Sequence, residues 1–165
     1  MEPQLPGTLS TPSPDAEDGE TRYRLHRRFD RMGRLVGDHQ MERLFASHVV
    51  VIGLGGVGSF AAESLLRSGI GRLTLVDFDR VCVTNTNRQL QAMRGTVGKL
   101  KAQVLAERLR LVNPQAEIEV VSRFYDAATS ALILTQTPTP DFVIDAIDNI
   151  TAKCHLIATC KQKRL

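Results

Sequence analysis

The chain has 165 residues, 42% of them hydrophobic and 24% charged, which is typical of a soluble globular protein with one domain. Its net charge of +3 is too small to argue nucleic-acid binding by itself, and no apolar run is long enough to cross a membrane. The sequence has three cysteines and no C-x-x-C pair, which argues against a disulfide framework and a zinc site. Because the N-terminus has no signal-peptide pattern, we expect a cytoplasmic protein.

Residues 1–21 are rich in Pro, Ser, Thr and acidic side chains, so we expect a disordered leader there, followed by a folded domain over residues 22–165. One or two short helices are predicted between Tyr23 and Phe45, broken near Gly33 or Gly37. From there on, the hydrophobic patterning predicts strands that alternate with helices. In chain order these are a strand at 48–52, a helix at 58–67, a strand at 72–76, a helix at 98–111, a strand at 117–121, a short helix at 127–135, a strand at 142–145 and a helix at 149–163.

Strands that alternate with helices indicate βαβ units. The predicted fold class is therefore α/β: a Rossmann-like, mostly parallel sheet with helices on both faces. A doubly wound fold of this kind normally has a second half. Because the sequence ends after the fourth strand and its helix, we interpret residues 22–165 as the N-terminal, incomplete part of such a domain, truncated at that point.

A glycine-rich segment joins the first predicted strand to its helix. The apolar run Val49–Ile52 is followed by Gly53, Gly55, Gly56 and Gly58 in the pattern G-x-G-G-x-G. Gly53 permits a tight turn, and Gly58 lets the helix pack on the strand. Gly55 and Gly56 let the backbone approach phosphates. Since the helix N-terminus also presents N–H groups to an anion, we expect a nucleotide to bind here.

An aspartate stands at the carboxyl end of the second predicted strand. Asp77 follows Gly53 at the sequence distance at which dinucleotide-binding folds place a carboxylate that accepts hydrogen bonds from a ribose. The glycines and this aspartate fit a nicotinamide- or flavin-dependent dehydrogenase as well as they fit an ATP-binding protein.

The polar residues that follow favour a triphosphate. Asp79 and Asn85 lie in the loop after the second strand, with Arg88 close behind them, and Lys101 lies near the start of the next helix. A triphosphate carries about two more negative charges than a dinucleotide diphosphate and needs cations as well as backbone amides. The alternative for Lys101 is a solvated side chain that covers a surface helix.

A third acidic position follows the fourth predicted strand. Asp77, Asp79 and Asp148 are all expected at the carboxyl edge of the sheet, where α/β folds bind ligands. Carboxylates beside phosphates suit magnesium, so Asp148 is the candidate metal ligand. The alternative is that Asp148 caps the last helix, and both roles can coexist if Asn149 is the true cap.

Together these motifs resemble the ThiF/MoeB/HesA adenylating family, the relatives of ubiquitin-activating enzymes. The resemblance runs from about Arg22 to the end of the chain. Within the family, the segment from Val81 to Gln89 resembles the branch that dehydrates threonylcarbamoyladenosine in tRNA to its cyclic form. The motifs that carry the family resemblance are Gly53–Gly58, Asp77-Phe78-Asp79, Asn85 with Arg88-Gln89, Val97-Gly98 with Lys101, and Asp145-Ala146-Ile147-Asp148.

The resemblance implies a set of roles. Asp77 would hold the ATP ribose, and Asp79 would belong to the same nucleotide site. Asn85, Arg88 and Lys101 would contact the phosphates, and Asp148 would bind Mg²⁺. The resemblance also implies a homodimer in which an N-terminal arginine of one chain reaches the ATP of its partner. In this sequence the candidate for that arginine is Arg31, and Arg34 is the second choice. The alternative is that the basic cluster to which both arginines belong is a solvated helix face or a non-specific phosphate patch.

The resemblance also implies the reaction. A carboxylate attacks the α-phosphorus of ATP and forms an acyl adenylate, with Arg88, Lys101 and the metal stabilising the phosphate charge. The substrate would be tRNA in the dehydratase branch, or a ubiquitin-like or sulfur-carrier protein in the others. A NAD-dependent dehydrogenase explains the glycines and Asp77, but not Arg88, Lys101 and Asp148 together. A non-catalytic nucleotide-binding fragment is a further alternative, and we expect the chain by itself to be inactive.

Overall fold

The computed structural model describes residues 27–136 and 138–165, so the leader expected at residues 1–21 lies outside the described residues. All four predicted strands are confirmed with their predicted bounds. The elements are η2 (Arg27–Phe29), α1 (Asp30–Val36), α2 (Asp38–Ala46), β1 (His48–Ile52), α3 (Gly58–Ser68), β2 (Arg72–Val76), η3 (Val83–Asn85), α4 (Lys101–Val112), β3 (Glu117–Val121), α5 (Ser130–Leu134), β4 (Phe142–Asp145) and α6 (Ile150–Lys163).

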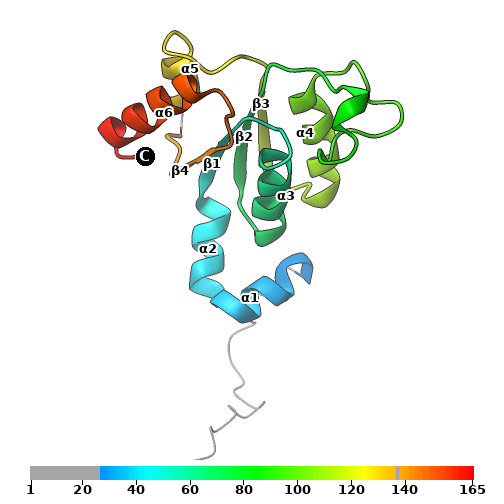
Figure 1. Cartoon of the computed structure of the whole chain (residues 1–165). Helices are drawn as coiled ribbons and strands as arrows, with labels where there is room; N and C mark the ends of the chain where they lie inside the picture. Colours follow the sequence, from blue (N-terminus) through cyan, green and yellow to red (C-terminus); the bar gives the residue numbers. More distant parts are fainter. Residues whose placement is uncertain (1–26, 137) are drawn as a thin grey trace, which may run out of the picture.

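The strands form one parallel sheet in the described part of the chain, in the order β3-β2-β1-β4. In the centre of the sheet, Val51 of β1 is in register with Leu75 of β2 on one side and with Ile144 of β4 on the other. Helices cover both faces, as Figure 1 shows. The α/β fold class predicted from the alternation of strands and helices is therefore confirmed.

Side chains alternate between the two faces of the sheet and build two core layers. On one face, Val51 and Leu75 pack with Leu66 of α3 and Leu105 of α4. On the other face, a second cluster contains Val50, Ile52, Val76, Ile133 of α5 and Leu156 of α6. Because β1 is buried along its whole length, its sequence is a continuous apolar run rather than an alternating one.

Two predicted helices begin later than expected. The helix predicted from residue 98 begins at Lys101, because Gly98 has a φ of +86° and its amide donates to Val81 instead of entering a helix. The helix predicted from residue 127 begins at Ser130, because Thr129 and Asp126 exchange side-chain-to-backbone hydrogen bonds of 2.8 and 3.0 Å that hold a turn. Local side-chain bonds of this kind compete with helix formation.

The two N-terminal helices lie at the opposite end of the sheet from the glycine-rich loop. Helices α1 and α2 are separated at Gly37, which has a φ of +82°, so the break predicted near Gly33 or Gly37 is confirmed at Gly37. Helix α2 leads directly into β1, and both helices therefore sit below the amino ends of the strands (Figure 1). Across residues 27–136 and 138–165, no helix has the length and apolar character needed to cross a bilayer.

The contact between the glycine-rich loop and α3 predicts a strong effect of Gly58→Ala. A Cβ at Gly58 would lie 1.8 Å from the carbonyl oxygen of Gly53, a backbone atom that cannot rotate away. We expect the free energy of unfolding, measured by urea denaturation, to fall by at least ~2 kcal/mol.

Gly55→Ala is the matched control for this substitution. The atom nearest to its added methyl is 4.0 Å away, so we expect the free energy of unfolding to change by no more than about 0.5 kcal/mol. Equal losses of stability in the two variants would contradict the packing argument.

Candidate active site

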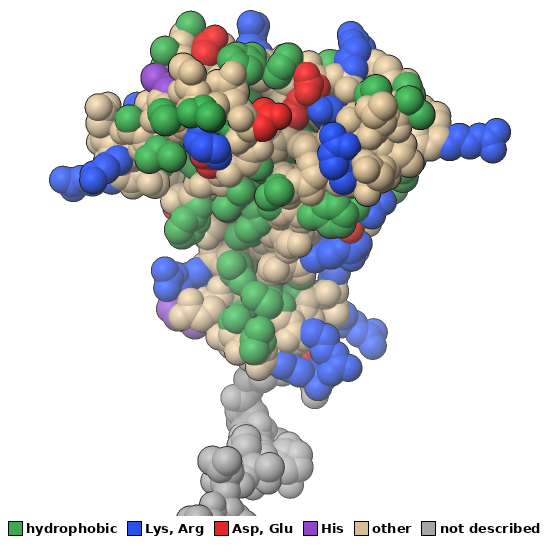
Figure 2. Space-filling view, viewed as in Figure 1, with side chains coloured by type: hydrophobic (Ala, Val, Ile, Leu, Met, Phe, Trp, Pro, Cys, Tyr) green, Lys and Arg blue, Asp and Glu red, His purple; other side chains and the backbone are tan. Residues whose placement is uncertain are grey.

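A cleft of about 420 Å³ opens at the carboxyl ends of the strands. Residues from the segments that follow all four strands line it, so it occupies the position at which α/β sheets bind ligands. Figure 2 shows acidic and basic side chains close together at this end of the molecule. Among the residues predicted for the site, the cleft brings together Gly53, Gly55, Gly56, Asp77, Asp79, Asn85, Arg88, Lys101 and Asp148.

The glycine-rich loop turns sharply where β1 ends. Gly53 has a φ of +88°, and a Cβ at this position would lie 2.5 Å from the carbonyl oxygen of Ala146, which follows β4. Only glycine meets both conditions, because other residues are strained at this φ and carry the Cβ that would clash. The tight turn predicted at Gly53 is therefore confirmed. Gly58 does not line the cleft, but it begins α3 directly behind the loop.

The carboxylate of Asp77 is buried and holds two backbone amides. Its Oδ2 accepts a hydrogen bond of 2.7 Å from the amide of Leu54, and its Oδ1 accepts one of 2.8 Å from the amide of Asp79. This structural role could not be predicted from the sequence, because it depends on a contact between the loops after β1 and β2. The contact of Asp77 with a ribose stays a prediction, and Asp79 offers a second carboxylate whose side chain is about half exposed.

Lys101 forms an ion pair with Asp79. The residue is 7% exposed, and its Nζ lies 2.8 Å from Asp79 Oδ2. It is the first residue of α4, where the positive end of the helix dipole disfavours a cation, and the carboxylate of Asp79 offsets that effect. The alternative of a solvated surface lysine is therefore wrong. Burial of Lys101 depends on the loop after β2 folding over the start of α4.

Arg88 provides a positive charge that has no acidic partner among the described residues. Its guanidinium donates to the carbonyl oxygen of Thr84 at 3.1 Å and to Asn87 Oδ1 at 3.0 Å, and the side chain is exposed in the cleft. Neighbouring Asn85 is buried, and its Oδ1 accepts a bond of 2.9 Å from the amide of Cys82, which leaves the side-chain NH₂ as a donor. An anion in the cleft would meet both groups.

Asp148 is exposed at the cleft and is not the cap of the last helix. The side chain of Asn149 accepts a hydrogen bond of 3.0 Å from the amide of Ala152, which makes Asn149 the N-cap of α6. Asp148 makes no hydrogen bond or ion pair with another residue of the described ranges. Its carboxylate is therefore free to bind a ligand. This is the arrangement expected from the sequence if Asn149, and not Asp148, caps the last helix.

Aromatic side chains at the cleft were missed by the sequence analysis. Phe78 and Phe124 follow β2 and β3, and their ring centroids are 5.1 Å apart in an edge-to-face arrangement. Both rings are partly exposed, at 51% and 40%. Arg123 and Tyr125 line the cleft beside Phe124. The only signal that these residues share is their sequence position, because each lies within four residues of the carboxyl end of a strand.

Two groups near the cleft have shifted pKa values. Burial raises the pKa of the Tyr125 phenol, whose oxygen lies 3.2 Å from Nδ1 of His155 on α6. A hydrogen bond from the Thr84 hydroxyl lowers the pKa of the Cys82 thiol, with Oγ1 and Sγ 3.2 Å apart. Tyr125 lines the cleft, and the amide of Cys82 donates to Oδ1 of Asn85, a residue that also lines it.

The N-terminal arginines do not join this cleft. Arg31 is exposed on α1, at the amino ends of the strands, and Arg34 of the same helix pairs with Asp30 at 3.2 Å. Basic side chains also gather at this lower end in Figure 2. Within one chain, Arg31 is therefore separated from the glycine-rich loop by the length of the sheet. Its contact with the ATP of a second chain stays a prediction.

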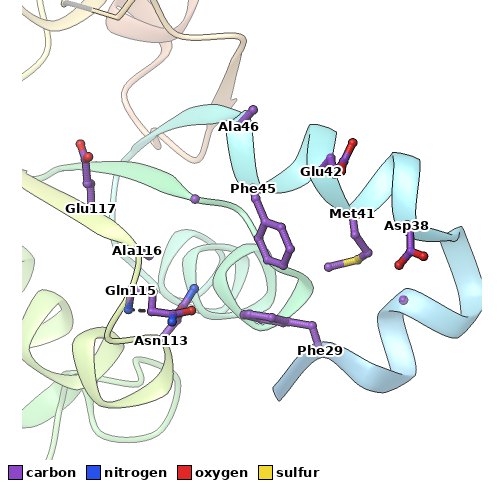
Figure 3. Close-up of a pocket in the computed structure, with 12 residues that line it drawn as sticks. Phe29, Asp38, Met41, Glu42, Phe45, Ala46, Asn113, Gln115, Ala116 and Glu117 are labelled. Carbon is purple, nitrogen blue, oxygen red and sulfur yellow. Dashed lines mark hydrogen bonds between the residues drawn. The ribbon is translucent and has the colours of Figure 1, made fainter. Parts of the chain in front are cut away.

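A second cavity of about 620 Å³ lies at the same lower end. In Figure 3, the side chains of Phe29, Met41 and Phe45 point toward one another beside the chain segment that leads into β3. Although this cavity is larger than the cleft, it contains neither the glycine-rich loop nor the cations predicted to bind phosphate. The residues predicted to bind a nucleotide therefore gather at the smaller cleft.

A comparison with protein families settles the family of the chain. The model of the ThiF family matches residues 29–165. The chain belongs to the ThiF family. The resemblance found in the sequence motifs is thereby confirmed.

Individual relatives of this ThiF-family chain include a tRNA-modifying enzyme. The tRNA threonylcarbamoyladenosine dehydratase of Haemophilus influenzae is 48% identical over 138 residues, which cover 84% of this chain and 52% of that protein. The molybdopterin-synthase adenylyltransferase of Escherichia coli is 36% identical over 119 residues, which cover 72% of this chain and 47% of that protein.

A solved structure matches the fold of this ThiF-family chain. The E. coli tRNA N6-threonylcarbamoyladenosine dehydratase in complex with ATP superposes with a TM-score of 0.81 at 44% sequence identity. The match covers 85% of this chain and 57% of that chain. The ThiF-family chain thus spans about half the length of the relatives it matches.

The hydrogen bonds of Asp77 predict a difference between two aspartate variants. In Asp77→Asn, one carboxylate oxygen is replaced by an NH₂ group that faces a backbone N–H, so a buried donor loses its acceptor. We expect the free energy of unfolding to fall by about 1–3 kcal/mol in urea denaturation.

Asp79→Asn is the comparison, because its side chain is about half exposed and its ion pair with Lys101 is partly screened by solvent. We expect a smaller loss of stability in this variant than in Asp77→Asn. A larger loss in Asp79→Asn would show that the ion pair, and not the Asp77 contact, holds the loops together.

Proposed function

We propose that this chain is the ATP-binding part of an enzyme that adenylates a carboxylate. The observation that carries the proposal is the convergence of the glycine-rich loop, Arg88, Lys101 and Asp148 on one cleft. Backbone N–H groups at the start of α3 suit phosphate oxygens. The unpaired charge of Arg88 adds the cation that a triphosphate requires. A nicotinamide-dependent dehydrogenase needs neither Arg88 nor Asp148.

The substrate that we propose is threonylcarbamoyladenosine in tRNA. The support is the 48% identity with a dehydratase that acts on it, against 36% with an adenylyltransferase that serves molybdopterin synthase. Activation of a ubiquitin-like or sulfur-carrier protein is the second candidate, because the adenylation half-reaction would use the same cleft. We further propose a cytoplasmic enzyme that works as a homodimer, with Arg31 reaching the partner's nucleotide.

The proposed reaction has two steps. In the first, a carboxylate oxygen attacks the α-phosphorus of ATP, the bond to the bridging oxygen breaks, and pyrophosphate leaves with that electron pair. In the second, the carbamoyl nitrogen attacks the activated carbonyl carbon and loses its proton, while AMP leaves as the ring closes. Arg88 and Lys101 would stabilise the negative charge that develops on the phosphates, and the loop amides would hold them in place.

Asp148 is the residue that we propose as a magnesium ligand. The described residues contain no group of three or more acidic, His or Cys side chains able to hold a metal alone. Magnesium does not need such a group, because it is commonly held by one or two carboxylates together with phosphate oxygens and water. An exposed carboxylate at the cleft, with no protein partner in the described ranges, fits that requirement. Bound magnesium would neutralise phosphate charge.

The aromatic pair at the cleft suits the adenine base. The half-exposed faces of Phe78 and Phe124 lie on the side of the cleft formed by the ends of β2 and β3, next to Asp77 and Asp79. A base bound there would place its ribose near the two carboxylates and its phosphates near the glycine-rich loop. Stacking of a base on an aromatic ring contributes about 1–3 kcal/mol.

The first test concerns the class of nucleotide. We expect the chain to bind ATP more tightly in the presence of Mg²⁺ and to bind NAD more weakly than ATP, as measured by titration calorimetry. In Arg88→Ala, the dissociation constant for ATP should rise about tenfold to a hundredfold, because charge-assisted hydrogen bonds are lost.

Arg94→Ala is the matched control, because Arg94 is an exposed arginine of the same loop that does not line the cleft. It should bind ATP like the unchanged chain. Tighter binding of NAD than of ATP, or equal losses in the two arginine variants, would contradict the proposal.

The second test concerns the substrate. When the chain is expressed together with the region that corresponds to the second half of its relatives, we expect AMP release with threonylcarbamoylated tRNA. A carrier protein with a free C-terminal carboxylate should give no exchange of pyrophosphate into ATP. Exchange that depends on the carrier protein and is indifferent to tRNA would favour the second candidate function instead.

A further inference from the structure

Leu54, the residue after the sharp turn at Gly53, is held on both sides of its backbone. Its amide donates to Asp77 Oδ2 at 2.7 Å, and its carbonyl oxygen accepts a hydrogen bond of 2.6 Å from Nε2 of Gln91. Its side chain is fully buried in the core. The glycine-rich loop therefore starts from a residue that is fixed by its amide, its carbonyl and its side chain.

Gln91 is fully buried and does not line the cleft. Its Nε2 also lies 3.4 Å from Oε1 of Gln89, but within the described part of the chain its own Oε1 has no hydrogen-bond partner. A buried acceptor without a partner costs about 1–3 kcal/mol, which an apolar side chain of equal length would avoid. Packing alone would therefore favour an apolar residue at position 91. What glutamine provides, and an apolar residue lacks, is the donor to the carbonyl oxygen of Leu54.

The segment that carries Arg88 is joined to the glycine-rich loop at a second point. The hydroxyl of Ser59 donates to the carbonyl oxygen of Gly55 at 2.7 Å and accepts a weak bond of 3.4 Å from the amide of Leu90. The backbone of Gln91 is itself tied by the hydroxyl of Thr96 at 2.7 Å. Gln91 and Ser59 together fix the position of the segment beside the loop, and Arg88 lies in that segment.

We propose that Gln91 is a positioning residue for the phosphate groups of the nucleotide. It contacts no phosphate itself. Its side-chain amide holds the carbonyl of Leu54, which fixes the distance between the loop amides and the guanidinium of Arg88. Both groups can then contact the phosphates at the same time. Only the identity of the ligand rests on the proposed function, because the hydrogen bonds around Leu54 and Gln91 exist without it.

The test compares Gln91→Met with Gln103→Met. Methionine has nearly the length of glutamine but no donor, and Gln103 is an exposed glutamine on α4. By calorimetry, we expect Gln91→Met to bind ATP about tenfold more weakly and to bind adenosine, which has no phosphates, as the unchanged chain does. By amide hydrogen exchange in the free chain, we expect Leu54 and Ser59 to exchange at least tenfold faster, while Gly53, whose amide bonds to Val76, is unaffected. Gln103→Met should change none of these quantities.

Two results would overturn the inference. One is unchanged exchange at Leu54 and Ser59 in Gln91→Met. The other is an equal loss of affinity for ATP and adenosine, which would indicate a general loss of packing. If Gln91→Met does not fold, Gln91→Leu provides the same comparison, because leucine also has no hydrogen-bond donor. If the unchanged chain binds no ATP, the proposed function fails, whereas the exchange measurement still decides whether Gln91 holds the loop.

Discussion

Two loops that follow neighbouring strands meet at the buried carboxylate of Asp77. Its oxygens accept the amides of Leu54, in the glycine-rich loop, and of Asp79, in the loop after β2. Hydrogen bonds to a charged acceptor that is shielded from water are strong and directional, so the two backbone segments cannot shift independently. Asp79 in turn holds Lys101 at the start of α4. The arrangement of three elements at the cleft thus follows from one side chain.

Charge is distributed unevenly around the cleft, and this distribution suits the proposed ligand. Lys101 already has an acidic partner in Asp79, whereas Arg88 is bonded only to uncharged acceptors. An incoming phosphate would therefore interact most strongly with Arg88 and the loop amides. Asp148 also lines the cleft, has no protein partner in the described ranges, and would be free to contact a cation bound to phosphate. The aromatic rings of Phe78 and Phe124 complete the cleft with an apolar surface.

The sheet also separates two ends of the molecule that carry different chemistry. The cleft lies at the carboxyl ends of the strands, and α1 and α2 lie at the amino ends with a basic surface and a second cavity (Figures 2 and 3). Because Arg31 sits on α1, a nucleotide contact from this residue requires a second chain. The role proposed for Arg31 therefore depends on the proposed dimer.

The sequence by itself determined the four strands, their bounds and the sharp turn at Gly53, because apolar runs, glycine and strand-end aspartates act over a few neighbouring residues. It also selected most of the polar residues of the cleft, although not Arg123 and Tyr125, since residues that follow parallel strands share one edge of the sheet. Only the tertiary structure decided that Lys101 is buried, that Asp77 holds the amide of Leu54, and that Gln91 holds its carbonyl. Each of these contacts joins segments more than 20 residues apart, and their pairing depends on strand order and on how the loops fold over one another. Local patterns do not encode either property, which is also why the start of α4 was misplaced.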